Sequence, residues 1–328
     1  MSDRRGDAAR PGGYPGGAPL VAVVRSGFVE GVHHGRVVAL DPAGGPVAAA
    51  GDVMAPVLPR SANKPLQAVG MLRCGLRLAD PADLAVVAAS HHGEDVHVAR
   101  VRALLRGAGL AETDLRCPPD LPLGAAARRA VLAAGGEPAR VLMNCSGKHA
   151  GMLLTCLAVG WPLADYRAVD HPLQQRLRTT FEELTDAPVA AQAVDGCGAV
   201  AHAASLRALA EAYLRLVTAE PGSVERTVAD AMRAHPELVG GTESEDTRLM
   251  AAVPGLLAKV GAEGVLAVAT PGVGAAAVKI DDGAPRARLP VLVSALHRLG
   301  LRTPGLDELA AVPVLGGGAP VGELRPLW

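Results

Sequence analysis

The spacing of apolar residues changes twice along this chain and divides it into three parts. Residues 20–52 contain short apolar runs separated by Ser-Gly, His-Gly and Pro-Ala-Gly-Gly turns. This pattern predicts two or three strands of an antiparallel meander. Residues 255–271 and 275–285 show the same strand pattern near the other end of the chain. Between these parts, apolar residues recur three and four positions apart, as they do on one face of a helix.

The middle of the chain is therefore predicted to be mostly helical. The predicted helices cover residues 63–75, 80–90, 94–109, 123–136, 149–160, 171–185, 200–217, 223–238 and, after the late strands, 290–300. Proline is tolerated in a first helical turn, so Pro65 places Ser61 at or just before a helix start. Strands at both ends around a helical middle predict an α+β fold. In it, the N- and C-terminal segments build an antiparallel sheet flanked by helices, and the middle forms a helix-rich subdomain.

Length and composition favour one globular unit. The chain has 328 residues, of which 49% are hydrophobic, enough to bury a substantial core. Residues 1–18, rich in Gly, Pro and Arg, are predicted to be a disordered tail before a single unit at 19–328. The longest apolar stretch is interrupted by Glu263 and Pro271, which argues against a membrane span. A formal net charge of −1 gives no attraction to nucleic acid or to an anionic membrane.

Lysine is scarce in this chain, and that scarcity directs attention to the lysines that remain. Of 32 basic Lys and Arg residues only four are lysines: Lys64, Lys148, Lys259 and Lys279. A buried lysine can lose its proton and act as a base or ligand, whereas arginine stays charged. Ser61 and Lys64 form a Ser-x-x-Lys pattern, which is typical of serine acyl transferases. The alternative is a helix-capping serine beside a solvated lysine.

Two short segments combine cysteine with other possible metal ligands. Asn-Cys-Ser-Gly-Lys-His at 144–149 precedes a predicted helix, and Asp-Gly-Cys-Gly occupies 195–198. A phosphate-binding loop would need glycine at Leu142, which excludes that motif. Thiolate and nitrogen ligands suit zinc, although a lone cysteine is more often a small buried hydrophobe. Five cysteines in so long a chain argue against a disulfide framework.

Five motifs taken together resemble a known family. They are RSANKPLQA, ASHHGEDVHV, NCSGKHAGML, DGCGA and KVGAEGV, in that order along the chain. The sequence resembles the L-asparaginase II family, the Rhizobium-type (class 3) asparaginases, over essentially everything after the tail. This resemblance implies a fold like that of serine β-lactamases and glutaminases. It also implies a cytoplasmic homodimer that hydrolyses L-asparagine to L-aspartate and ammonia.

The resemblance also implies roles for the residues of the first, second and fifth motifs. Ser61 corresponds to the nucleophile and Lys64 to its partner base. Ser90 corresponds to a second catalytic serine, paired with Lys259 in a second serine-lysine tandem. Arg60 is expected to bind the substrate. Two tandems of this kind predict acyl transfer to water.

The third and fourth motifs are expected to hold a metal. By resemblance, Cys145, Lys148 and Cys197 are ligands of a zinc ion, and Asp195 lies close to the substrate or the metal. Lysine must be neutral to bind a metal, so zinc affinity is expected to fall as protons compete. Because the serines already supply a nucleophile, the metal is expected to orient or polarise the substrate.

The chain also departs from the family pattern, and two other functions remain open. Glu243, Ser244 and Glu245 stand where a Gly-Arg pair is expected, and Val200 replaces a frequent proline. A β-lactam-recognising serine acyl transferase would share Ser-x-x-Lys, but the chain lacks Ser-Asp-Asn and Lys-Thr-Gly. A non-catalytic zinc or amino-acid sensor would need only the cysteines and Lys148.

Overall fold

The computed structural model describes Tyr14 and residues 16–328. The tail predicted at 1–18 therefore lies almost entirely outside the described residues. The described strands are β1 (Ala18–Arg25), β2 (Phe28–Leu40), β3 (Pro46–Ala50), β4 (Pro56–Val57), β5 (Ala191–Val194), β6 (Val200–Ser205), β7 (Leu257–Val260), β8 (Val265–Thr270), β9 (Gly274–Ile280), β10 (Pro313–Gly316) and β11 (Ala319–Pro326).

Helices fill most of the middle of the chain. The described α-helices are α1 (Lys64–Arg73), α2 (Pro81–Val87), α3 (Asp95–Gly107), α4 (Ala125–Ala133), α5 (Ser146–Val159), α6 (Pro172–Thr185), α7 (Leu206–Thr218), α8 (Val224–Ala234), α9 (Pro236–Val239), α10 (Glu245–Ala252), α11 (Arg288–Arg298) and α12 (Pro304–Ala310). Short 3₁₀ helices are η2 (Arg60–Asn63), η3 (Glu112–Asp114) and η4 (Pro285–Ala287). No helix in the described part of the chain is long and apolar enough to cross a bilayer.

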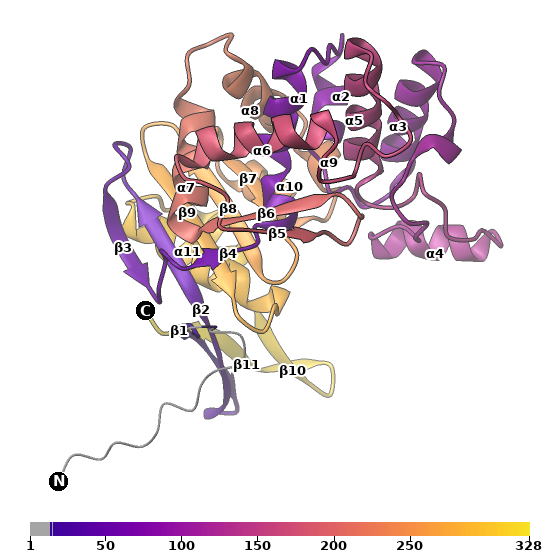
Figure 1. Ribbon diagram of the computed structural model, residues 1–328. Coiled ribbons are helices and arrows are strands. Elements are labelled where there is room, and N and C mark those ends of the chain that lie inside the picture. Colours follow the sequence, from indigo (N-terminus) through magenta and orange to yellow (C-terminus); the bar gives the residue numbers. More distant parts are fainter. Residues whose placement is uncertain (1–13, 15) are drawn as a thin grey trace.

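The larger sheet is antiparallel and joins the two ends of the chain. Its strand order is β10-β11-β1-β2-β9-β8-β7, and β3 pairs with β2. Figure 1 shows the indigo N-terminal strands beside the yellow C-terminal ones, with the magenta helices of the middle grouped above them. The predicted α+β fold, with a sheet built from both termini and a helical middle, is confirmed.

The core lies along the central strands of this sheet. Every residue of β8 is buried, and successive side chains point to opposite faces, so both faces of β8 are covered. Helix α7 packs against β2, β8 and β9, and α11 packs against β2, β9 and β11. This packing holds β7, at the edge beside β8, in a fixed position.

One predicted helix begins later than expected. Residues 200–217 were predicted to be helical throughout, but Val200–Ser205 form strand β6, which pairs with β4 and β5. Gly198 has a φ of 82° and turns the chain between β5 and β6. Ser205 then accepts a hydrogen bond from the backbone N–H of Ala208, so the helix starts only at Leu206.

Candidate active site

Ser61 lies in the 3₁₀ turn η2, which is pressed against the main sheet. Strands β7 and β8 both contact η2. Gly261, directly after β7, approaches so closely that an added Cβ would lie 2.3 Å from the Pro59 carbonyl oxygen. Arg60 has a φ of 52°, a left-handed conformation that costs a non-glycine residue about 1–3 kcal/mol. The backbone that carries Ser61 is thus fixed by a strained turn and a close strand contact.

Lys64 and Ser90 form a buried hydrogen-bonded pair. The Lys64 side chain is 1% exposed, and its Nζ donates to Ser90 Oγ at 2.8 Å and to the Ala89 carbonyl oxygen at 2.5 Å. Ser90 follows shortly after α2, so these contacts join the start of α1 to the end of α2. The sequence predicts that Lys64 pairs with Ser61; the hydrogen bonds of the Lys64 amine in the structure go to Ser90 and Ala89.

Lys259 on β7 pairs with a carboxylate that the sequence analysis missed. Its Nζ is fully buried, lies 3.2 Å from Asp246 Oδ2 and donates to the Val260 carbonyl oxygen. The other oxygen of Asp246 accepts the Val260 backbone N–H at 2.6 Å. Lys259 therefore meets Asp246, not the predicted partner Ser90. Burial lowers the pKa of Lys259, reinforced by the positive charge of Lys64 and opposed by Asp246.

These residues converge on one cavity of about 510 Å³. Ser61, Ser90 and Lys259 all line it, together with Asn144 and Arg288. Arg288 begins α11 and was not singled out in the sequence, because it lies just before the helix predicted at 290–300 and arginine side chains are usually solvated. Here it is buried and donates to the Gly261 carbonyl oxygen. The cavity thus combines two hydroxyls with buried cationic side chains.

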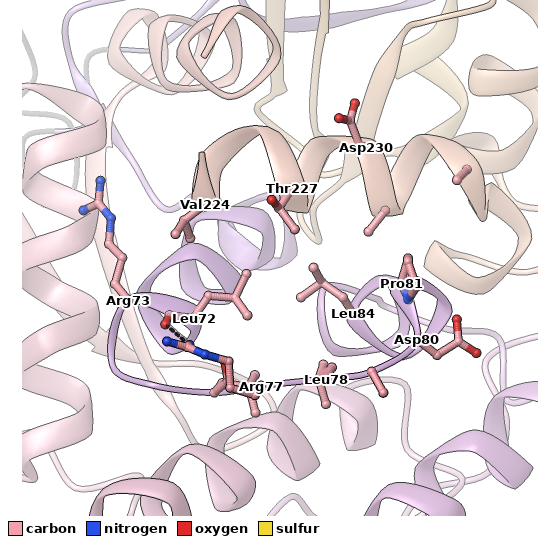
Figure 2. Close-up of a pocket in the computed structure, with 14 residues that line it drawn as sticks. Leu72, Arg73, Arg77, Leu78, Asp80, Pro81, Leu84, Val224, Thr227 and Asp230 are labelled. Atoms are coloured by element: carbon pink, nitrogen blue, oxygen red, sulfur yellow. Dashed lines mark hydrogen bonds between the residues drawn. The ribbon is translucent and has the colours of Figure 1, made fainter. Parts of the chain in front are cut away.

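A larger cavity elsewhere carries no comparable chemistry. It has a volume of about 740 Å³ and lies between α1, α2 and α8. Figure 2 shows Leu72, Leu84 and Val224 pointing into it. Its described lining contains no serine, cysteine, lysine or histidine. By volume alone, this larger cavity would be the candidate active site. The cavity at Ser61 is the better candidate because nucleophilic and basic side chains line it.

Cys145, Lys148 and Cys197 form a buried cluster near the N-terminus of α5. Lys148 Nζ lies 3.0 Å from Cys197 Sγ. A hydrogen bond from the Cys145 thiol lowers the pKa of Cys197, helped by the Lys148 ammonium, and the same bond raises the pKa of Cys145. Burial alone would lower the pKa of Lys148, but the charge on the cysteine sulfurs outweighs it and raises that pKa. The protonation state of each of these three side chains thus affects the pKa of the other two.

The donor atoms of this cluster fit zinc. Two cysteine sulfurs are donors that tetrahedral zinc sites use, whereas a lysine amine is an unusual zinc ligand and must lose its proton to bind. Within the described residues no group of three or more His, Cys, Asp and Glu side chains could hold a metal. A site here therefore needs the Lys148 amine as a ligand. Asp195 Oδ2 lies 3.8 Å from Cys197 Sγ and adds an oxygen close by.

Arg60 and Asp195 connect the serine turn to the cysteine turn. Arg60 Nε donates to Asp195 Oδ1 at 2.7 Å, and both side chains are largely buried. Arg60 directly precedes Ser61, and Asp195 lies two residues before Cys197. One charged hydrogen bond thus fixes η2 relative to the β5–β6 turn.

A comparison with known families identifies the family of this chain. The sequence model described as L-asparaginase II matches residues 21–326, nearly the whole chain. No curated protein matches the sequence. The matched range contains both serines, the three buried lysines and the cysteine cluster of the site. The chain belongs to the L-asparaginase II family and is an amidohydrolase that acts on asparagine.

Proposed function

We propose that the enzyme converts L-asparagine to L-aspartate and ammonia through an acyl-enzyme formed on Ser61. The observation that carries this proposal is the shared cavity: Ser61, Ser90 and Lys259 line it, and Lys64 is hydrogen-bonded to Ser90. A serine hydroxyl becomes a nucleophile when a neutral amine takes its proton. Two buried lysines beside two serines supply this arrangement.

The reaction has two halves. Ser61 Oγ attacks the side-chain amide carbon while its proton passes through Ser90 to Lys64. The C–N bond then breaks, and the proton leaves with the nitrogen as ammonia. Water next attacks the ester, the C–Oγ bond breaks, and the proton from water returns to Ser61. Lys259 is the second amine of the relay, and its lowered pKa favours the neutral form that can accept a proton.

The rest of the site is assigned to substrate and metal. We propose that Cys145, Lys148 and Cys197 hold zinc, as their donor atoms favour. When bound, zinc supplies a positive charge that polarises an oxygen ligand. Arg60 and Asp195 are the proposed substrate contacts between this cluster and Ser61. Their mutual hydrogen bond keeps the guanidinium and the carboxylate oriented before substrate arrives.

The family resemblance also supports an assembly and a location. We propose that the enzyme is a homodimer and works in the cytoplasm. Light scattering of the purified chain should give twice the mass of 33.3 kDa calculated for one copy. A single-copy mass at micromolar concentration would contradict the dimer.

The test of the proposed function is ammonia release by wild type and Ser61→Ala. We expect the variant to lose roughly 10⁴-fold or more in kcat with asparagine, because the attacking oxygen is gone. Ser294→Ala is the matched control, because Ser294 on α11 bonds the Trp328 carbonyl oxygen away from the cavity.

Metal analysis and an amide panel complete the experiment. Asparagine and glutamine are compared with and without a chelator, and bound zinc is measured in each preparation. Full activity of Ser61→Ala would refute the acyl-enzyme. Zinc bound without turnover of either amide would favour a sensor, and turnover of a chromogenic β-lactam would favour the acyl transferase.

A further inference from the structure

An ion pair that the reaction scheme leaves without a role forms part of the wall of the Ser61 cavity. Arg288 at the start of α11 and Glu245 at the start of α10 approach to 3.0 Å, and both line that cavity. Their side chains are 11% and 22% exposed. This ion pair is more buried than an ordinary surface salt bridge. Removing each charge from water costs free energy unless the charge is fully paired.

Both members are attached to the residues that carry the proposed chemistry. The Arg288 guanidinium donates to the Gly261 carbonyl oxygen at 3.1 Å, and Gly261 packs against the backbone of η2. Glu245 directly precedes Asp246, which holds Lys259. The ion pair is thus fixed relative to both the nucleophile and a catalytic lysine.

Each member also has one polar atom with nothing to bond. Glu245 Oε2 and Arg288 Nε are buried, and neither finds a hydrogen-bond partner among the described residues. Buried polar groups are nearly always satisfied, so unpaired atoms in two residues that line a cavity leave hydrogen-bonding capacity for a ligand that reaches them. Burial also raises the pKa of Glu245 against the opposing charge of Arg288. A cationic ligand group would favour the ionised carboxylate.

We infer that Glu245 and Arg288 bind the α-ammonium and α-carboxylate groups of a free amino-acid substrate. Glu245 Oε2 accepts from the ammonium, and Arg288 Nε donates to the carboxylate. This inference rests on the proposed function and deepens it, because it defines the substrate class as zwitterionic amides. Lys259 is unsuited to this task since its Nζ is already occupied by Asp246 and the Val260 carbonyl oxygen. Glu243 also lines the cavity but is exposed.

The test compares substrates that lack one group each. Succinamic acid is asparagine without the α-amino group, and 3-aminopropanamide is asparagine without the α-carboxylate. Wild type should prefer asparagine to either by about 100-fold or more in kcat/KM. Glu245→Gln should raise KM for asparagine roughly 10- to 100-fold while leaving succinamic acid unaffected, because that substrate has no ammonium to lose. Glu308→Gln, at an exposed position of α12 outside the cavity lining, is the control and should behave as wild type.

Arg288→Lys supplies the complementary measurement. It should lower kcat/KM for asparagine and succinamic acid, which both keep a carboxylate. The kcat/KM for 3-aminopropanamide should not change. Equal losses on all three substrates in either variant would overturn the inference, since they would indicate a purely structural pair. Wild-type turnover of succinamic acid as fast as asparagine would overturn it as well, even if a variant failed to fold.

Calorimetric binding separates this inference from the proposed function. L-Asparagine is titrated into Ser61→Ala, with and without Glu245→Gln. Weaker binding with the second substitution supports the pair even if wild type releases no ammonia, an outcome that would refute only the proposed reaction. Equal binding in both proteins, or none in either, would refute the pair.

Discussion

Close backbone contact at single glycines fixes the site, and Gly147 is the clearest case. It lies in the first turn of α5 between Cys145 and Lys148, and an added Cβ would sit 2.3 Å from the Val86 carbonyl oxygen of α2. Neither backbone can move without shifting the cysteine cluster or the chain that leads to Ser90. The absence of a side chain is therefore a packing requirement.

Gly147→Ala should lower the free energy of unfolding by about 1–3 kcal/mol, because the methyl group overpacks this contact. The matched control is Gly107→Ala in α3, where an added Cβ meets nothing within 4 Å. That change should be neutral or stabilising by up to about 1 kcal/mol through helix propensity. Urea denaturation measures both, and equal effects would contradict the packing argument.

At the residue scale the sequence indicated the lysines but not their partners. Scarcity singled out Lys64 and Lys259, and both are fully buried beside the cavity. Their hydrogen-bond partners depend on where the end of α2 and the start of α10 lie in space, which spacing along the chain does not encode. Asp246 and Arg288 belong to common residue types and lie outside the predicted helices. Their burial, not their spacing, distinguishes them.

At the element scale, helices with clear periodicity and capping were predicted well. Helices α10 and α12 and strands β10 and β11 were not predicted. Strand β6 was predicted to be helical, because its six residues form a short apolar run that fits a helix or a strand equally. Residues 200–205 form a strand because they pair with β5 across the Gly198 turn, and this pairing depends on the tertiary fold. The small β4-β6-β5 sheet was missed for the same reason.

A buried histidine makes β6 sensitive to acid. His202 packs against Phe181, and burial together with the charge of Arg178 lowers its pKa to about 4. The unfolded chain has a histidine pKa near 6.5, so below that value the unfolded state binds the additional proton. The stability contributed by neutral His202 is present above about pH 6.5 and is lost as the pH falls towards 4.

His202→Leu removes this titration. From pH 7 to pH 4 the wild type should lose about 2–3 kcal/mol more of its unfolding free energy than the variant loses. Urea denaturation at several pH values measures the difference. His34→Gln, at an exposed position of β2, should follow wild type. Parallel curves for wild type and His202→Leu would show that His202 is accessible to protons in the folded state.

At the scale of the whole molecule, the pattern of strands at both ends around a helical middle predicted the architecture. The order of strands was not predictable, because it depends on which edges remain open after the helices pack. In the structure, β11 pairs with β1 and brings Leu324 opposite Val23. The two ends of the chain thus meet inside the sheet.

Leu324→Asp should therefore destabilise the entire protein. Leu324 is buried in the core, and an unpaired carboxylate there should cost roughly 3 kcal/mol or more. Leu315→Asp on β10 is the control, because Leu315 is 55% exposed and should change stability by less than about 0.5 kcal/mol. Thermal melting compares the two, and similar melting temperatures would contradict a shared terminal core.

The close contact between Gly261 and the turn that carries Ser61 has a consequence for biosynthesis. The ribosome makes Ser61 early, but β7 and Arg288 emerge only after the helical middle of the chain has been translated. A nascent polypeptide that ends before β7 contains Ser61 but lacks the strand that packs against the Ser61 turn. The cavity at Ser61 is therefore complete only after β7 and Arg288 have been translated.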